Sequence, residues 1–277
     1  MSMLRVAAVV GFVTCFGWSC TLAAEPGEVA PQAQPTLAQS LVLDGSLGLL
    51  YTDNALATQT GRIDSGYLVP FLRLTYGLKS ADGWAYTIYA RNTSETYTER
   101  TGDNALATVG STLSKTAGEI TAGVNFDTKF FFDGFYADRS ITAYDLSAFI
   151  TQPHTYTNIG LLVVPRLTLG YRWADIARVE RSFIDAQLSF EKTITEQWSL
   201  LAGARFRVYR FNTALAGPAP VDYYPSASLG LKYDFGHGVT LATSVSFLAR
   251  RSNVATRNYD RLDVGPSVDF KYPLPLP

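Results

Sequence analysis

Residues 223–249 read YYPSASLGLKYDFGHGVTLATSVSFLA, and this stretch decides the fold. Apolar side chains take nearly every second position from Tyr223 to Phe235, and the alternation resumes from Val239 to Phe247. A period of two is typical of β-strands, whose side chains alternate between two faces. Because the Gly-His-Gly turn at 236–238 separates the two runs, the stretch predicts an antiparallel hairpin.

The side chains on the second face of this hairpin are small and mildly polar, and Lys232 and Asp234 are the only charged ones. Ser226, Ser228, Ser244 and Ser246 supply much of it. A strand that faces water usually carries charged side chains, whereas small polar side chains are typical of the interior of a membrane barrel. We therefore expect the apolar face to meet lipid and the serine face to line a barrel.

The first 24 residues have the pattern of a cleaved secretory signal. A basic start ending at Arg5 precedes an apolar run over 6–20, and small residues up to Ala24 form the expected cleavage site. Both cysteines, Cys15 and Cys20, lie in this signal, so we expect no disulfide in the exported chain. A retained membrane anchor and a lipoprotein acylated at Cys20 are the alternatives.

The rest of the chain divides into three parts. Residues 25–39 are rich in Pro, Gln and Ala and predict a flexible periplasmic lead-in. The alternating pattern fills 40–272, and a Pro-rich periplasmic tail is expected over 273–277. No segment after the signal has the roughly 20 apolar residues of a membrane helix, and only helices and closed barrels can cross lipid. The sequence thus predicts an all-β protein, a transmembrane antiparallel up-and-down β-barrel.

Eleven strands are clear from the alternation. They are expected over 41–51, 68–76, 84–90, 120–126, 144–150, 159–171, 184–190, 198–208, 223–235, 239–249 and 262–272. Single-chain bacterial barrels have an even number of strands, so we predict twelve, with the additional strand over 129–136, and ten as the alternative. The sequence Asp-Asn-Ala-Leu-Ala-Thr occurs at 53–58 and again at 103–108, and both copies are expected to open outer loops.

Aromatic residues gather at the ends of the apolar stripes. Such positions are typical of the two aromatic girdles of a membrane barrel, because amphipathic rings favour the lipid headgroup zone. The predicted lipid-facing girdle comprises Trp84, Tyr171, Trp198, Tyr223, Tyr233 and Phe270.

The last strand carries a resemblance to a known class of protein. Asp263-Val-Gly-Pro-Ser-Val-Asp-Phe270 resembles the C-terminal sorting signal of Gram-negative outer-membrane β-barrel proteins, of which small porin-like barrels are one group. The resemblance implies an outer-membrane location, lipid as surroundings and recognition of the last strand by the barrel-assembly machinery. The chain departs from the pattern because it continues past Phe270 to Pro277.

Charged residues on the face opposite the apolar stripe form the candidate functional site. The lumen candidates are Arg73, Arg91, Glu119, Arg166, Asp185, Arg205, Arg207 and Lys232. Charges inside a barrel either pair and fill it or line a water path. Pairing that stiffens a narrow lumen is one interpretation. The other is a constriction of Arg73, Arg166, Arg205 and Arg207 that favours small anionic solutes.

The sequence predicts no catalytic residue, metal site or cofactor. Its two histidines, His154 and His237, stand apart from any serine or carboxylate cluster at a spacing that hydrolysis would favour. The formal net charge of −1 gives no reason to expect a nucleic-acid partner. The leading hypothesis is therefore a porin-like channel for passive passage of small solutes and not an enzyme. A non-conducting structural, adhesion or assembly barrel is the alternative, and an outer-membrane enzyme is the least supported.

Overall fold

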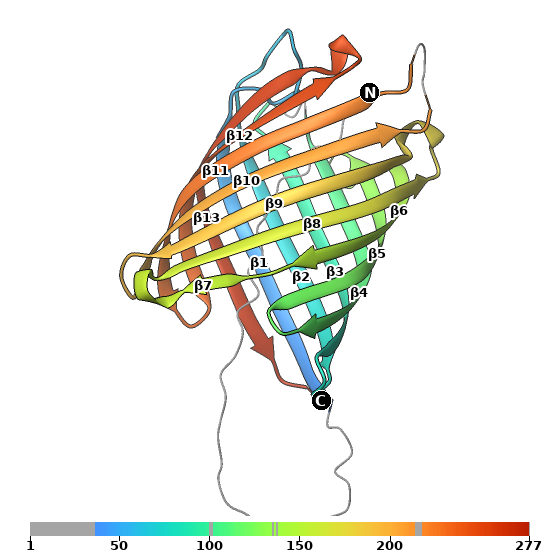
Figure 1. Cartoon of the computed structure of the whole chain (residues 1–277). Coiled ribbons are helices and arrows are strands. Elements are labelled where there is room, and N and C mark those ends of the chain that lie inside the picture. Colours follow the sequence, from blue (N-terminus) through green and yellow to red (C-terminus); the bar gives the residue numbers. More distant parts are fainter. Residues whose placement is uncertain (1–36, 100–101, 135, 137, 214–217, 277) are drawn as a thin grey trace, which may run out of the picture.

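The computed structural model describes residues 37–99, 102–134, 136, 138–213 and 218–276, which form a closed β-barrel (Figure 1). The predicted signal at 1–24 and residues 25–36 of the predicted lead-in lie outside the described residues. Within the described residues, no helix has the length and apolar character needed to cross a membrane.

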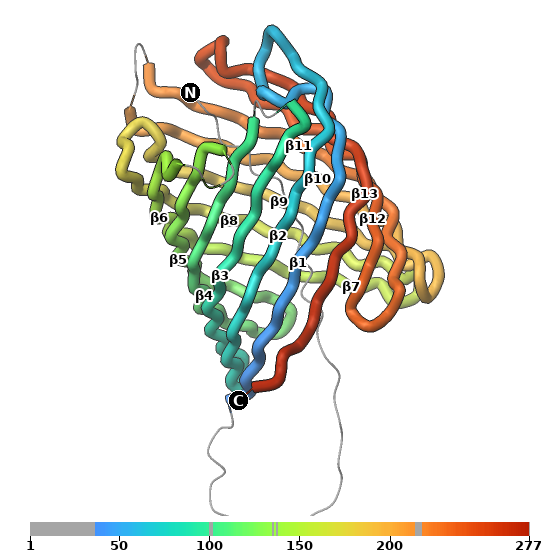
Figure 2. The backbone as a smooth tube through the Cα atoms, turned by 180° about the vertical axis from the view of Figure 1, so that it is seen from behind, coloured from blue at the N-terminus to red at the C-terminus, as the bar shows by residue number. Residues whose placement is uncertain are grey.

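The barrel wall consists of twelve antiparallel strands within the described ranges. They are β1 (Ala38–Thr52), β2 (Ser65–Lys79), β3 (Trp84–Tyr97), β4 (Asn104–Ala117), β5 (Ile120–Asp133), β6 (Asp138–Thr151), β8 (Leu161–Ala174), β9 (Arg181–Thr193), β10 (Trp198–Phe211), β11 (Val221–Gly236), β12 (Val239–Ser252) and β13 (Tyr259–Leu274). Each strand pairs with the next along the chain, β6 pairs with β8, and β1 lies beside β13 to close the barrel (Figure 2).

Four short elements lie in the connections. The three-residue strand β7 (His154–Tyr156) pairs with the start of β8 and adds to the sheet beside the wall. It is followed by the 3-10 turn η1 (Thr157–Ile159). Two further 3-10 turns, η2 (Ala177–Val179) and η3 (Ala255–Arg257), lie in the β8–β9 and β12–β13 connections.

The predicted number of strands is confirmed, but the predicted place of the twelfth strand is wrong. Residues 129–133 are the second half of β5, and the strand that the alternation missed is β4. Its outer face has only two exposed large apolar side chains, Val109 and Leu113. Alanine, serine and threonine fill most other positions, so the period of two is faint. The second Asp-Asn-Ala-Leu-Ala-Thr copy therefore starts β4 and does not open a loop, whereas the first copy opens the β1–β2 loop as predicted.

The barrel also extends further at both ends of the chain than 40–272. β1 begins at Ala38, and β13 continues through Pro273 to Leu274, so the prediction that the tail leaves the strand at 273 is wrong for two residues. Past Phe270, β13 has no paired residue on β12 and pairs with β1 alone, with Pro273 opposite Val42. Proline lacks a backbone N–H donor, and it is tolerated where a strand pairs with a neighbour on one side only.

The outer surface of the barrel is apolar all the way round. Each of the twelve strands exposes at least one large apolar side chain, for example Leu47, Leu72, Ile88, Val109, Val124, Leu146, Leu167, Ile184, Phe206, Leu229, Val245 and Val264. A water-soluble barrel would need a polar outer face, whereas lipid requires an apolar one. The wall is therefore that of a transmembrane barrel.

The two ends of the barrel differ, and we call them the turn end and the loop end. The turn end holds four short connections, 80–83, 118–119, 194–197 and 237–238, the longer connection 152–160, the start of β1 and the end of β13. The loop end holds the connections 53–64, 98–103, 134–137, 175–180, 212–220 and 253–258. Both described ends of the chain lie at the turn end because the number of wall strands is even.

The β11–β12 turn gives a stability prediction at the turn end. Gly238 has a φ of +78°, and a Cβ there would lie 2.2 Å from the carbonyl oxygen of Lys271 on β13. We expect Gly238→Ala to lower the free energy of unfolding by about 1–3 kcal/mol, because the left-handed backbone is strained and the neighbouring strand must move. Denaturant unfolding of the refolded protein would measure it. Gly118→Ala is the matched control, since Gly118 has a φ of +59° with nothing within 4 Å, and an equal loss in both variants would contradict the argument.

Candidate functional site: the barrel interior

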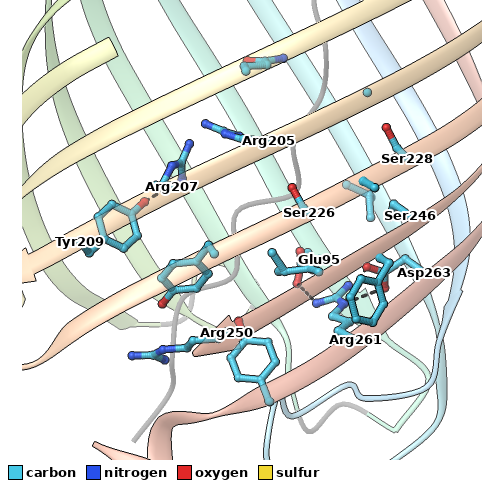
Figure 3. A pocket seen from close by; sticks show the side chains of 18 of the residues that line it. Glu95, Arg205, Arg207, Tyr209, Ser226, Ser228, Ser246, Arg250, Arg261 and Asp263 are labelled. Carbon is cyan, nitrogen blue, oxygen red and sulfur yellow. Dashed lines mark hydrogen bonds and ion pairs between the residues drawn. The ribbon is translucent and has the colours of Figure 1, made fainter. Parts of the chain in front are cut away.

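A cavity of about 840 Å³ lies inside the barrel, largely along β9 to β13 (Figure 3). At the loop end its lining includes Arg178 and Thr256, and toward the turn end it includes Gly230 and Asp269. Ser226, Ser228, Ser244 and Ser246 line one wall, which places the small polar face of the β11–β12 hairpin in the interior. The cavity therefore runs from the loop end to beyond the middle of the barrel.

Arginines outnumber carboxylates two to one among the described residues that line this cavity. The arginines are Arg172, Arg178, Arg181, Arg205, Arg207, Arg250, Arg257 and Arg261, and the carboxylates are Glu95, Asp133, Asp263 and Asp269. Several of these arginines pair with carboxylates that do not line the cavity themselves, such as Asp185 and Asp222.

Asp185 on β9 shows how this wall is built. Its side chain accepts hydrogen bonds from Arg205 Nε at 2.7 Å and from Arg207 at 2.6 and 2.9 Å. The residue is only 8% exposed, while both guanidinium groups line the cavity (Figure 3). One buried carboxylate thus holds two cations in fixed positions. The two arginines line the cavity, and the carboxylate does not.

A second buried carboxylate, Asp145, also contacts two cations, one from β5 and one from β8. Asp145 on β6 accepts two hydrogen bonds from Arg172, at 2.6 and 2.7 Å, and one from Lys129 at 2.5 Å. Lys129 also lies 3.4 Å from Asp127. Planar guanidinium and carboxylate groups that meet edge to edge make strong and directional contacts.

Asp222 at the start of β11 is the most buried of these carboxylates, with 0% exposure. It pairs with Arg250 on β12 and, at 2.8 Å, with Arg257 from η3. Burial, followed by the neighbouring Arg250 charge, lowers the pKa of the Arg257 guanidinium, although Asp222 acts in the opposite direction. This lowering reflects mainly the burial of the Arg257 guanidinium group at the loop end.

Side chains from β2, β3 and β13 form another part of the wall, which has the reverse balance. Arg261 donates from Nε to Asp263 at 2.6 Å and lies 4.0 Å from Glu95, so two carboxylates share one cation (Figure 3). The stacked rings of Tyr67 and Tyr97, with centroids 4.8 Å apart, donate their hydroxyls to Asp263 and Glu95. Positive charge is therefore in excess around Asp185 and Asp222, and not around Arg261.

The structure brings some of the predicted lumen residues together and separates others. Arg205 and Arg207 share Asp185, as just described. Arg73 pairs with Asp44 on β1 at 3.0 Å and Arg166 lies over the Phe149 ring at 4.1 Å, and neither lines the main cavity. Of the four arginines predicted to form a constriction, Arg205 and Arg207 line the main cavity, and Arg166 lines a second, smaller pocket together with Arg205.

The remaining lumen candidates lie elsewhere. Arg91 is 3.9 Å from Asp127, and Lys232 pairs with Glu191 toward the turn end. Placing Glu119 in the lumen was wrong, because it lies in the β4–β5 turn and its side chain is 72% exposed. Its position in the alternation suggested a strand, but the chain reverses there with Gly118 at a positive φ.

Sequence reasoning missed several residues of the cavity wall. Asp222 and Arg250 share the parity of the interior serines on their strands, so extending the alternation by two or four residues would have found them. Arg181 occupies the first position of β9, three residues before the predicted strand. Arg257 comes from a loop, where no periodicity exists to place it.

The six predicted girdle aromatics all lie on strand positions of outward parity. Trp84, Trp198, Tyr233 and Phe270 lie near the turn end, and Tyr171 and Tyr223 lie near the loop end. Neighbouring rings contact each other, with centroids 4.9 Å apart for Trp198 and Tyr233. The placement is that expected of two interfacial bands.

The histidines lie at the turn end. His154 begins β7, with Nδ1 3.9 Å from Glu119, and His237 is in the β11–β12 turn. Among the described residues, no three His, Cys, Asp or Glu side chains converge in a way that could hold a metal ion.

Comparison with known proteins shows which of them have a similar fold. No family model matches the sequence, and no curated protein is similar to it. An outer membrane channel from Pseudomonas putida F1 has a TM-score of 0.58 and 14% identity, with 88% of this chain and 100% of that chain covered. A bacterial polysaccharide outer membrane secretin has a TM-score of 0.50 and 10% identity, covering 84% of this chain and 98% of that one.

These likenesses concern the fold. The chain has the fold of bacterial outer-membrane β-barrel proteins, as the resemblance of its last strand implied.

Proposed function

We propose that the protein is an outer-membrane channel through which small solutes pass passively, with a preference for anions. The observation that carries the proposal is the repeated arrangement of one buried carboxylate behind two cavity-facing cations. Asp185 and Asp222 each hold two arginines in this way. A pore wall with rings or rows of fixed arginine favours anions. The potential inside such a pore is positive, and little water lies between the wall and the ion to screen it.

The orientation follows from the architecture of outer-membrane barrels. Such barrels have short periplasmic turns and longer extracellular loops, so the turn end would face the periplasm and the loop end the outside. The cavity would then open toward the exterior. Lipid would surround the apolar band, and the assembly machinery would receive the chain through β13.

A non-conducting structural barrel is the second candidate, and one observation favours it. The β1–β2 loop folds inward, so that Asn54 and Ala55 are completely buried. Asn54 Nδ2 donates to the carbonyl oxygens of Asp260 at 2.7 Å and Thr58 at 2.9 Å, which ties the loop to β13. This loop and the paired charges at Asp145 occupy part of the lumen.

Planar-bilayer recording distinguishes the two candidates. We expect discrete current steps in symmetric KCl, and under a KCl gradient a zero-current potential with the sign of chloride permeation. A barrel that inserts without conducting would support the structural role. A potential with the sign of potassium permeation would refute the anion preference.

A further inference from the structure

We propose that the loop-end half of the cavity contains a binding site for small organic carboxylates with an apolar body, centred on Arg181. The site lies within the channel proposed above and names a class of solute for it. It rests on three features: a guanidinium group without a carboxylate partner, two aromatic rings that contact it, and an apolar mouth.

Arg181 lacks the partner that its neighbours have. Across the β8–β9 ladder it lies opposite Arg172, another cation, and within the described ranges it forms no ion pair. Its Nε is buried and has no hydrogen-bond partner there, and the same is true of Nε of Arg257. A buried polar group without a partner is destabilising, more so when it is charged, and a bound anion would relieve this cost.

Aromatic rings hold this guanidinium group in place. Its Cζ lies 4.0 Å from the ring centroid of Tyr209 and 5.2 Å from that of Phe211. The Cζ of Arg257 lies 4.5 Å from the Phe211 centroid, so two cations share that ring. A ring that covers one face of a guanidinium leaves its edge for a planar carboxylate, which can accept two parallel hydrogen bonds.

The surroundings of Arg181 suit an apolar body attached to the carboxylate. Ile176, Val179, Pro218, Pro220 and Val254 line the cavity at the loop end, and all five come from connecting segments. Connections on a water-facing rim usually carry polar side chains, whereas pockets for small molecules are mainly apolar with a few fixed polar groups. A chloride or phosphate ion would gain nothing from these side chains, but an alkyl or aryl carboxylate would bury its body against them.

Binding of sodium acetate, butyrate and hexanoate at pH 7 and constant ionic strength tests the proposal. Isothermal titration calorimetry on the full chain in zwitterionic nanodiscs, with empty nanodiscs as the blank, needs no ion current. Each buried methylene contributes at most about fourfold in affinity. We expect hexanoate to bind at least tenfold more tightly than acetate, and Arg181→Gln to weaken hexanoate binding at least tenfold.

Arg139→Gln is the matched control, because Arg139 is exposed on β6 and does not line the cavity, and its hexanoate affinity should equal that of the wild type. Equal affinity for acetate and hexanoate, no hexanoate binding, or unchanged binding in Arg181→Gln would each overturn the site. If Arg181→Gln fails to fold, the chain-length series on the wild type still tests the proposal, because equal affinity for acetate and hexanoate would overturn it. Chloride current without hexanoate binding would overturn this site and leave the channel standing, and binding without current would do the reverse.

Discussion

Leu229→Arg is expected to prevent the barrel from inserting into a bilayer. Leu229 lies near the middle of β11, opposite Ala202 and Val245, and its side chain is 51% exposed on the apolar outer face. An arginine near the bilayer midplane of a barrel costs about 2–4 kcal/mol, since lipid offers the charge neither water nor a partner. Folding into vesicles, followed by electrophoresis with and without heating, would show the loss of the heat-modifiable band.

Ser228→Arg is the matched control for this variant. Ser228 is the adjacent residue, but it faces the cavity, where water can solvate a charge. It should fold and insert like the wild type. Normal insertion of Leu229→Arg, or equal failure of both variants, would contradict the assignment of the two faces.

Asp222→Asn is expected to cause a large loss of stability, although the substitution leaves the volume of the side chain unchanged. The Asp222 carboxylate is completely buried against the guanidinium groups of Arg250 and Arg257. Removing one partner from a buried ion pair leaves uncompensated charge in the wall, at a cost of about 3–5 kcal/mol. The midpoint of unfolding by guanidinium chloride should fall accordingly.

Asp138→Asn controls for the loss of a carboxylate at the same end of the barrel, because Asp138 is exposed at the start of β6. It should change the unfolding free energy by less than about 0.5 kcal/mol. A midpoint for Asp222→Asn within that range would show that this carboxylate does not hold the two arginines in place.

The fold was predictable because lipid reverses the usual burial rule. Along 223–249 the apolar stripe and the small polar face both continue for the full strand, so one hairpin specified the sheet, its two faces and its surroundings. β4 was missed for the same reason, because Ala105, Ala107 and Ser111 give its outer face little contrast with its inner one. The even number of strands supplied the right total but could not say where the weak strand lay.

The site was predictable only in part, because parity gives the face of a residue and not its neighbours. Arg205 and Arg207 were expected in the lumen, and their shared carboxylate, Asp185, was among the candidates. Which arginine meets which carboxylate depends on how the strands pair, so parity alone could not show that Arg73 pairs with Asp44 or that Arg73 and Arg166 lie outside the lining of the main cavity.

The contribution of loops was beyond the reach of periodicity altogether. Arg257 in η3 and the buried segment at Asn54 both take part in the interior, yet each comes from a connection with no alternation. Their positions depend on contacts with strands far away in the sequence, such as the hydrogen bond from Asn54 to Asp260.

The zero-current potential of Arg205→Gln under a KCl gradient, compared with that of the wild type, tests the central claim most directly. The variant removes one cation from the wall, while Asp185 keeps Arg207 as its partner. We predict a wild-type potential of the sign of chloride permeation and a clear shift toward potassium in the variant, with Arg139→Gln unchanged. An identical potential in wild type and Arg205→Gln, or a wild-type preference for potassium, would contradict the claim that this arginine wall selects what enters the barrel.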